Sequence, residues 1–79
     1  MTNKEKYDNV FMECLGLGAD QLNEALVYNS VKAWDSVGHM AMMAALEREF
    51  DIMLETDDII DFSSYPKGMQ LLAKYEVQF

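Results

Sequence analysis

Apolar side chains recur at helical spacing along most of the chain. In residues 4–15 they follow the i, i+3, i+4, i+7, i+8 pattern of an amphipathic helix. The positions concerned are Tyr7, Val10, Phe11, Cys14 and Leu15. Gly16 and Gly18 come next, and glycine commonly ends a helix. We therefore predict a helix over residues 4–15 that stops at these glycines.

A second helix is predicted from Asp35 or Ser36, either of which suits the N-cap, to about Phe50. Its core positions are Met42, Met43, Leu46 and Phe50. The connection between the two helices is roughly twenty residues long, which is unusual in a compact domain unless its apolar side chains pack down. Within it, residues 20–26 are expected to form a helical turn capped by Asp20, and Trp34 is the largest candidate for burial.

Two shorter helices are predicted after residue 55. Thr56 caps the first, with acidic residues in its opening turn, where the helix dipole favours negative charge. Ser63 or Ser64 caps the second, and Pro66 is tolerated in its first turn. The expected core positions of both helices are Ile59, Ile60, Phe62, Met69, Leu72, Ala73 and Tyr75. The fold class is therefore all-α: a small four-helix bundle of three longer helices and one short helix, with a long loop between the first two.

Composition narrows the range of partners. The 79 residues include 14 acidic and six basic side chains, which gives a formal net charge of −8. Phosphate backbones and anionic lipid surfaces repel such a chain, whereas basic protein surfaces attract it. We therefore expect no nucleic acid, no membrane insertion and a monomer with basic protein partners. Residues 1–79 are expected to form one domain.

The single cysteine, Cys14, excludes an intrachain disulfide. The first ten residues are polar and lack the apolar run of a signal peptide. The longest apolar run, residues 40–46, is far shorter than the roughly 20 residues that span a bilayer. These features favour a cytoplasmic location.

No catalytic or metal-binding motif stands out. The acidic run 51–61 has Met53 and Thr56 where a calcium loop needs an acidic or amide side chain and a glycine. Cys14 and His39 fall on different predicted helices, so no zinc site or nucleophilic dyad is specified. Asp35, Ser36 and His39 have the composition of a catalytic triad, but neighbours at a helix start rarely converge into one. We expect no enzyme activity and no bound metal.

The second predicted helix has two apolar faces. Val37, Met40 and Ala44 form a stripe separate from its core positions. Such a helix is either central in the fold or presents a surface to a partner. Methionine suits an adaptable contact surface, which favours the partner.

These features together resemble an acyl carrier protein, or more broadly a phosphopantetheine-dependent carrier domain. The motif Asp35-Ser36-Val37 matches the family's Asp-Ser-aliphatic signature at a helix start. Residues 46–52, LEREFDI, match the LExxFxI-like stretch about ten residues later. The resemblance extends from the first helix to Tyr75, and includes the order of the helices, the size and the negative charge.

The resemblance implies that Ser36 carries a covalent 4′-phosphopantetheine arm. A carrier-protein synthase (phosphopantetheinyl transferase), with magnesium, transfers the arm from coenzyme A, and its thiol then holds acyl groups as thioesters. Loading and transfer enzymes with basic patches are the further implied partners. Their expected contacts are Asp35, Val37, Met40, Ala44, Glu47, Glu55, Asp57 and Asp58. A long acyl chain is expected to lie between the helices, lined by residues such as Phe50, Met43, Leu46, Phe62 and Leu72.

Several positions depart from the familiar fatty-acid carriers. Gly38, His39 and Ala41 stand where those carriers have more acidic residues, and Trp34 replaces a small residue. Glycine at position 38 is expected to weaken the first helical turn by up to about 1 kcal/mol relative to alanine. We therefore expect a specialised carrier for lipid, surface polysaccharide or secondary metabolite biosynthesis. The alternatives are an aminoacyl, D-alanyl or peptidyl carrier, and a small helical adaptor without a prosthetic group.

Overall fold

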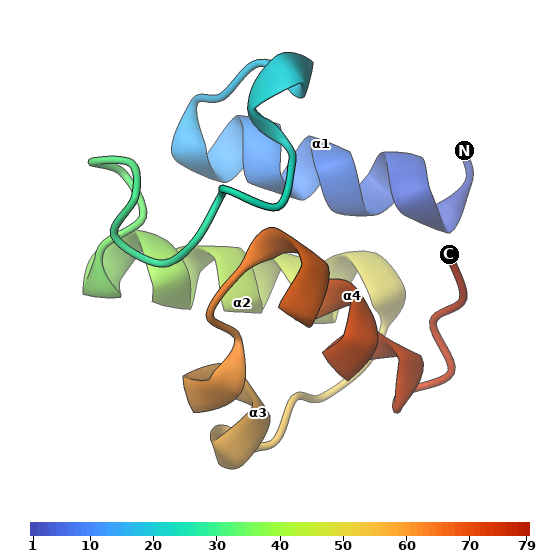
Figure 1. Ribbon diagram of the computed structural model, residues 1–79. Coiled ribbons are helices and arrows are strands. Elements are labelled where there is room, and N and C mark those ends of the chain that lie inside the picture. The colour runs from blue at the N-terminus through green and yellow to red at the C-terminus, as the bar shows by residue number, and fades with distance from the viewer.

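The computed structural model describes residues 1–79 and contains four α-helices and no β-strand (Figure 1). The helices are α1 (Asn3–Leu15), α2 (Ser36–Phe50), α3 (Thr56–Asp61) and α4 (Tyr65–Ala73), and a 3₁₀ turn, η1 (Ala19–Gln21), lies between α1 and α2. The all-α class predicted from the hydrophobic pattern is confirmed. No helix has the length and apolar character needed to cross a membrane.

Most helix boundaries follow from local capping chemistry. Gly16 adopts a left-handed conformation with φ of 67° and ends α1, as predicted. Ser64 caps α4 by accepting a hydrogen bond from the Lys67 N–H at 3.1 Å, which decides between the two serines. The prediction for Thr56 was wrong. It is the first helical residue of α3, and the preceding Glu55 occupies the cap position without a side-chain capping bond.

The loop after α1 also differs from its prediction. Its helical turn is shorter than the expected 20–26 and begins at Ala19, so Asp20 lies inside the turn and Gly18 precedes it. Further along, the Tyr28 N–H donates to the Ser63 carbonyl at 2.8 Å, and the Tyr65 N–H donates to the Leu26 carbonyl at 2.9 Å. These bonds fasten the loop to the α3–α4 junction and so fix the approach of the chain to α2.

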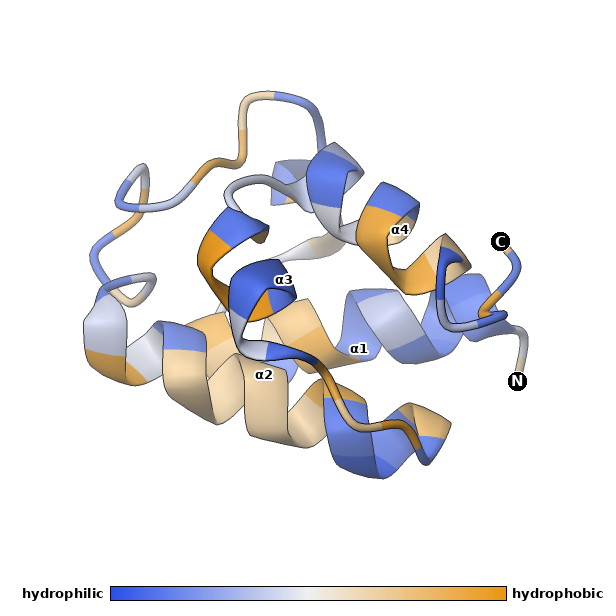
Figure 2. Ribbon diagram, turned by 90° about the horizontal axis from the view of Figure 1, so that it is seen from below, coloured by the Kyte–Doolittle hydropathy of each residue, from blue (hydrophilic) through white to orange (hydrophobic).

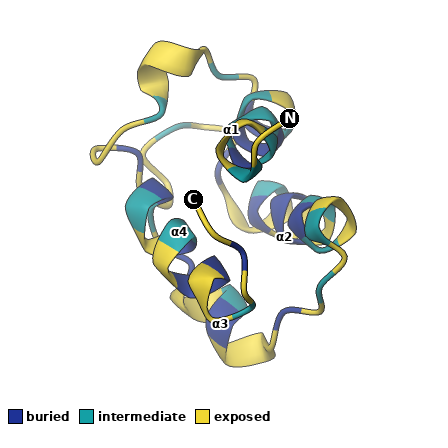
Figure 3. Ribbon diagram, turned by 90° about the vertical axis from the view of Figure 1, so that its right-hand side faces the viewer, coloured by how far each residue is buried: buried dark blue, intermediate teal, exposed yellow.

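The helices and the loop enclose one apolar core. Its 15 buried side chains are Tyr7, Val10, Phe11, Leu15, Leu26, Trp34, Met42, Met43, Leu46, Leu54, Phe62, Tyr65, Leu71, Leu72 and Val77. Figure 3 shows that the buried positions lie on the faces that α1, α2 and α4 turn inward. The predicted core of α2 is confirmed for Met42, Met43 and Leu46, while Phe50 is half-buried.

Two predicted core positions are exposed. Ile60 is 72% exposed because the short helix α3 directs Ile59 and Phe62 toward the interior and Ile60 away from it. In α4, Leu71 is buried and Ala73 is exposed. Both termini lie at the same end of the molecule (Figure 1), where Asn3 Nδ2 donates to the Gln78 carbonyl at 3.0 Å.

Candidate functional site

The start of α2 presents the Ser36 hydroxyl to solvent. Asp35, in an extended conformation, is the N-cap, and its Oδ1 accepts a hydrogen bond from the Gly38 N–H at 2.8 Å. Ser36 is therefore the first helical residue rather than the cap, and its side chain is exposed. Since Asp35 performs the capping, the Ser36 hydroxyl is not needed to hold the helix start in place.

The first turn of α2, which carries this hydroxyl, has backbone donors without acceptors. The N–H groups of Ser36 and Val37 have no acceptor within the chain, as expected in the first turn of a helix. The helix dipole adds positive potential at the same place. An anionic group attached to Ser36 is therefore stabilised by α2 itself.

Gly38 is required by the packing of this helix start. A Cβ at position 38 would overlap the backbone carbonyl oxygen of Ala33 and approach its carbonyl carbon to 3.2 Å. The expected weakening of this turn by glycine relative to alanine is therefore opposed by a steric clash, because the loop passes too close for any side chain. The loop and the first turn of α2 pack as one unit.

Trp34 and His39 join this unit to α3 through two hydrogen bonds. The Trp34 indole N–H donates to His39 Nδ1 at 2.9 Å, and His39 Nε2 lies 2.7 Å from the Ile59 carbonyl oxygen. An indole N–H can only donate, so Nδ1 accepts and Nε2 carries the hydrogen that it donates to Ile59. The two rings also stack, with centroids 6.2 Å apart. The only histidine in the chain thus connects the loop, α2 and α3.

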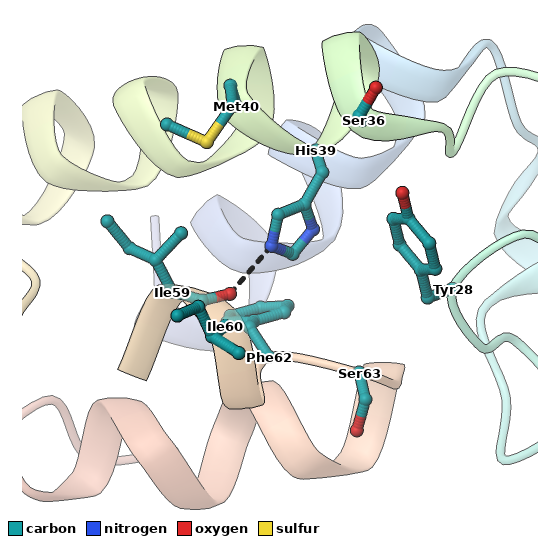
Figure 4. A pocket seen from close by; sticks show the side chains of 8 residues that line it. All are labelled: Tyr28, Ser36, His39, Met40, Ile59, Ile60, Phe62 and Ser63. Atoms are coloured by element: carbon teal, nitrogen blue, oxygen red, sulfur yellow. Dashed lines mark hydrogen bonds between the residues drawn. The ribbon is translucent and has the colours of Figure 1, made fainter. Parts of the chain in front are cut away.

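A cavity of about 340 Å³ opens beside Ser36, between the loop, the first turns of α2, and α3 (Figure 4). It is lined by Tyr28, Ser36, His39, Met40, Ile59, Ile60, Phe62 and Ser63. Ser36 stands at its edge with the hydroxyl directed away from His39 (Figure 4). Most of the lining is apolar, and the polar groups are the hydroxyls and the imidazole.

The cavity is not where an acyl chain was expected. Of the five residues predicted to line an acyl chain, only Phe62 lines this cavity. Met43, Leu46 and Leu72 are at most 1% exposed and belong to the packed core. The second cavity, lined by residues between Asp20 and Val31, also lies away from them. The interior of the protein is therefore filled by its own side chains.

The predicted contact face of α2 is exposed. Val37 and Met40 are 77% and 55% exposed, and Asp35 and Ala44 are exposed as well. Ile60 on α3 is also apolar and exposed, and it lines the same cavity as Met40. Figure 2 shows hydrophobic positions along α2 and on α3. This set, Val37, Met40, Ala44 and Ile60, is called the apolar stripe below.

The acidic residues predicted to join this face divide into two groups. Glu55 and Asp57 are exposed. Glu47 accepts a hydrogen bond from the Leu54 N–H at 2.8 Å and is half-buried, so it holds the connector after α2. Asp58 is 7% exposed, and its carboxylate accepts hydrogen bonds from Lys74 at 2.6 Å and from the Tyr75 hydroxyl. Asp58 thus ties α3 to the end of α4 and presents little surface to a partner.

We expect Asp58→Asn to destabilise the protein near pH 7 and to have little effect in acid. Hydrogen bonds from Lys74 and then Tyr75 hold the pKa of the Asp58 carboxyl below its ordinary value of 3.8. A carboxyl group whose pKa is lowered by folding stabilises the fold when the pH is above its ordinary pKa. This contribution is lost as the pH falls through the lower pKa of the folded state. In urea denaturation, the variant should therefore have a lower free energy of unfolding than the wild type at pH 7. Well below pH 3.8 the two free energies should be nearly equal. Exposed Asp57→Asn serves as the control and should show a smaller difference at pH 7.

Some site residues were not found from the sequence. Tyr28 and Ser63 reach the cavity from separate loops, and only the hydrogen bonds between those loops bring them together. Cys14 lies on α1, half-buried, and burial raises its pKa, as expected for a packed thiol rather than a reactive one. No group of three or more His, Cys, Asp or Glu side chains is arranged to hold a metal ion.

No family model matches the chain, and no curated protein or solved structure is detectably similar to it. The function of the protein is therefore inferred from the geometry of the site.

Proposed function

We propose that this chain is a carrier protein that holds acyl groups as thioesters on a 4′-phosphopantetheine arm attached to Ser36. The observation that carries the proposal is the position of the Ser36 hydroxyl. It is exposed at the first residue of α2, Asp35 takes over the capping, and a largely apolar cavity opens beside it. A merely structural serine would need neither the free hydroxyl nor the cavity.

The residues present suit the proposed group. Transfer from coenzyme A forms a phosphodiester at Ser36 Oγ, breaks the pyrophosphate bond, and releases the serine proton and adenosine 3′,5′-bisphosphate. The amides of Ser36 and Val37 and the α2 dipole offset the added negative charge. When bound, the arm supplies a terminal thiol for thioester chemistry. The chain's own role is to fix the root of the arm and present it.

Partner enzymes would dock on the apolar stripe and on the acidic residues around it. Asp35, Glu55 and Asp57 are exposed and favour a partner with basic residues around an apolar contact. We further propose that the helices form a carrier-type four-helix bundle acting as a monomer in the cytoplasm. The uncharged first half of α2 favours a dedicated biosynthetic pathway over bulk fatty acid synthesis. An aminoacyl or peptidyl carrier has the same arm and differs only in its cargo.

The proposal is tested by incubating the purified protein with coenzyme A, magnesium and a promiscuous phosphopantetheinyl transferase, and measuring its intact mass. We expect the wild type to gain the mass of one arm and Ser36→Ala to gain none. Ser63→Ala is the matched control, because Ser63 lines the same cavity and is also exposed. It should be modified like the wild type.

A helical adaptor without an arm is the second candidate. The exposure of Val37 and Met40 favours it, because such a stripe suits protein contact with or without a prosthetic group. Unchanged mass in both the wild type and Ser63→Ala would support the adaptor and rule out the carrier.

A further inference from the structure

His39 lies between the cavity beside Ser36 and the buried ring of Trp34. It is 9% exposed and lines the cavity on one side. Its ring stacks on Trp34 and meets the edge of Phe62, with centroids 6.1 Å apart in the second case. Trp34 and Phe62 are 0% and 1% exposed, so they belong to the packed interior. A group that enters the cavity from Ser36 meets the imidazole and Phe62 before it reaches the core.

Hydrogen bonds hold this barrier from two sides. Nδ1 accepts from Trp34 and Nε2 donates to the Ile59 carbonyl, which joins α2 to α3 across the inner end of the cavity (Figure 4). Moving the ring aside breaks both bonds and leaves the buried indole N–H and the partly buried Ile59 carbonyl without these partners. The barrier is therefore rigid compared with a barrier made of aliphatic side chains alone.

The size of the cavity sets what fits in front of the barrier. Its volume of about 340 Å³ is roughly twice that of a dry apolar cavity of about 150 Å³ that binds benzene. By this comparison it holds on the order of ten non-hydrogen atoms. A long acyl chain would have to continue past His39 into space that Met43, Leu46 and Leu72 already fill.

We propose that His39 limits this cavity to a short aliphatic group tethered to Ser36 and keeps longer chains out of the core. The inference rests on the proposed carrier function. Two sources supply such a group: the branched dimethyl segment near the root of the arm, and a short acyl cargo. In either case a long cargo stays outside the fold, where partner enzymes reach it without the carrier having to open.

Methionine methyl groups provide the test, because they lie on both sides of the barrier. Met40 lines the cavity, Met42 and Met43 are buried in the core, and Met53 is 84% exposed as a reference. The protein, labelled with ¹³C at its methionine methyl groups, is loaded with the arm alone, with a butyryl arm, and with a decanoyl arm. Intact mass confirms each loading before spectra are recorded.

We expect the Met40 resonance to move while those of Met42, Met43 and Met53 stay in place, even with decanoyl. Movement of Met40 with the arm alone identifies the dimethyl segment as the occupant, and movement only with butyryl identifies the cargo. The inference would be overturned if the Met40 resonance stayed in place in every loaded form. It would also be overturned if decanoyl moved the resonances of Met42 and Met43 in the wild type. Failure to load at all refutes the carrier function instead, so the two failures are distinct.

Two variants test His39 itself. In His39→Gln the side-chain amide can still accept one hydrogen bond and donate another, as the imidazole does. The barrier should therefore persist, and decanoyl should leave the Met43 resonance in place. In His39→Ala the barrier is absent, and decanoyl should move Met43. An unchanged Met43 in folded His39→Ala would contradict the role of His39. If that variant does not fold, the spectrum of the decanoyl-loaded wild type still shows whether a long chain enters the core.

Discussion

Trp34→Ala is expected to destabilise the protein by about 3–5 kcal/mol, the usual cost of removing a buried large aromatic side chain. Trp34 is fully buried, and its ring contacts Phe11, His39 and Phe62. Domains of this size are stable by roughly 4–12 kcal/mol in total, at about 0.05–0.15 kcal/mol per residue. The substitution should therefore remove between about a quarter and all of the protein's stability.

Trp34→Phe is the matched comparison. It keeps an aromatic ring and removes the N–H that donates to His39, leaving a buried acceptor unsatisfied at a cost of about 1–3 kcal/mol. Because Trp34 is the only tryptophan, urea unfolding should be followed by helical circular dichroism rather than fluorescence. A Trp34→Ala protein within 1 kcal/mol of the wild type would show that the loop is not anchored through this ring.

Gly38→Ala should destabilise the protein by about 1–3 kcal/mol or more, as overpacked sites commonly do. Helix propensity alone predicts the opposite sign, a gain of up to about 1 kcal/mol. The added methyl group would overlap the Ala33 carbonyl oxygen, which is backbone and cannot turn aside as a side chain does. The loop would have to move, and the Asp35 cap and Ser36 with it.

The sign of this change separates the two explanations. Ala41→Gly, at an exposed position of the same helix, measures the effect of propensity and should cost about 1 kcal/mol. Chemical denaturation of the three proteins makes the comparison. A stabilised Gly38→Ala would mean that the loop does not pack against the first turn of α2 in solution.

The helices were predictable because their signals are local. Periodic apolar residues, Gly16 after α1, and Pro66 with Ser64 at the start of α4 each act within one or two turns. Helical spacing also indicated the second apolar face with Val37 and Met40, but left open whether that face is exposed, as it is in the structure. Predictions were weakest for α3, whose six residues are too few for a periodic pattern to distinguish Ile59 from Ile60.

Contacts between distant segments set the rest of the site. Nothing near Asp58 in the sequence indicates that Lys74 and Tyr75 engage its carboxylate. Likewise, the spacing of Trp34 and His39 does not reveal that the imidazole reaches the Ile59 carbonyl. The role of Gly38 depends on how closely the loop approaches α2, which local propensity does not describe.

The attachment of the arm to Ser36 is tested most directly by tryptic digestion of the protein after treatment with coenzyme A and the transferase. Cleavage after Lys32 and Arg48 releases residues 33–48, in which Ser36 is the sole hydroxyl-bearing side chain. We expect this peptide to carry the mass of one phosphopantetheine group and the peptides containing Ser30, Ser63 and Ser64 to be unmodified. An unmodified 33–48 peptide, or an arm found on another serine, would contradict the assignment.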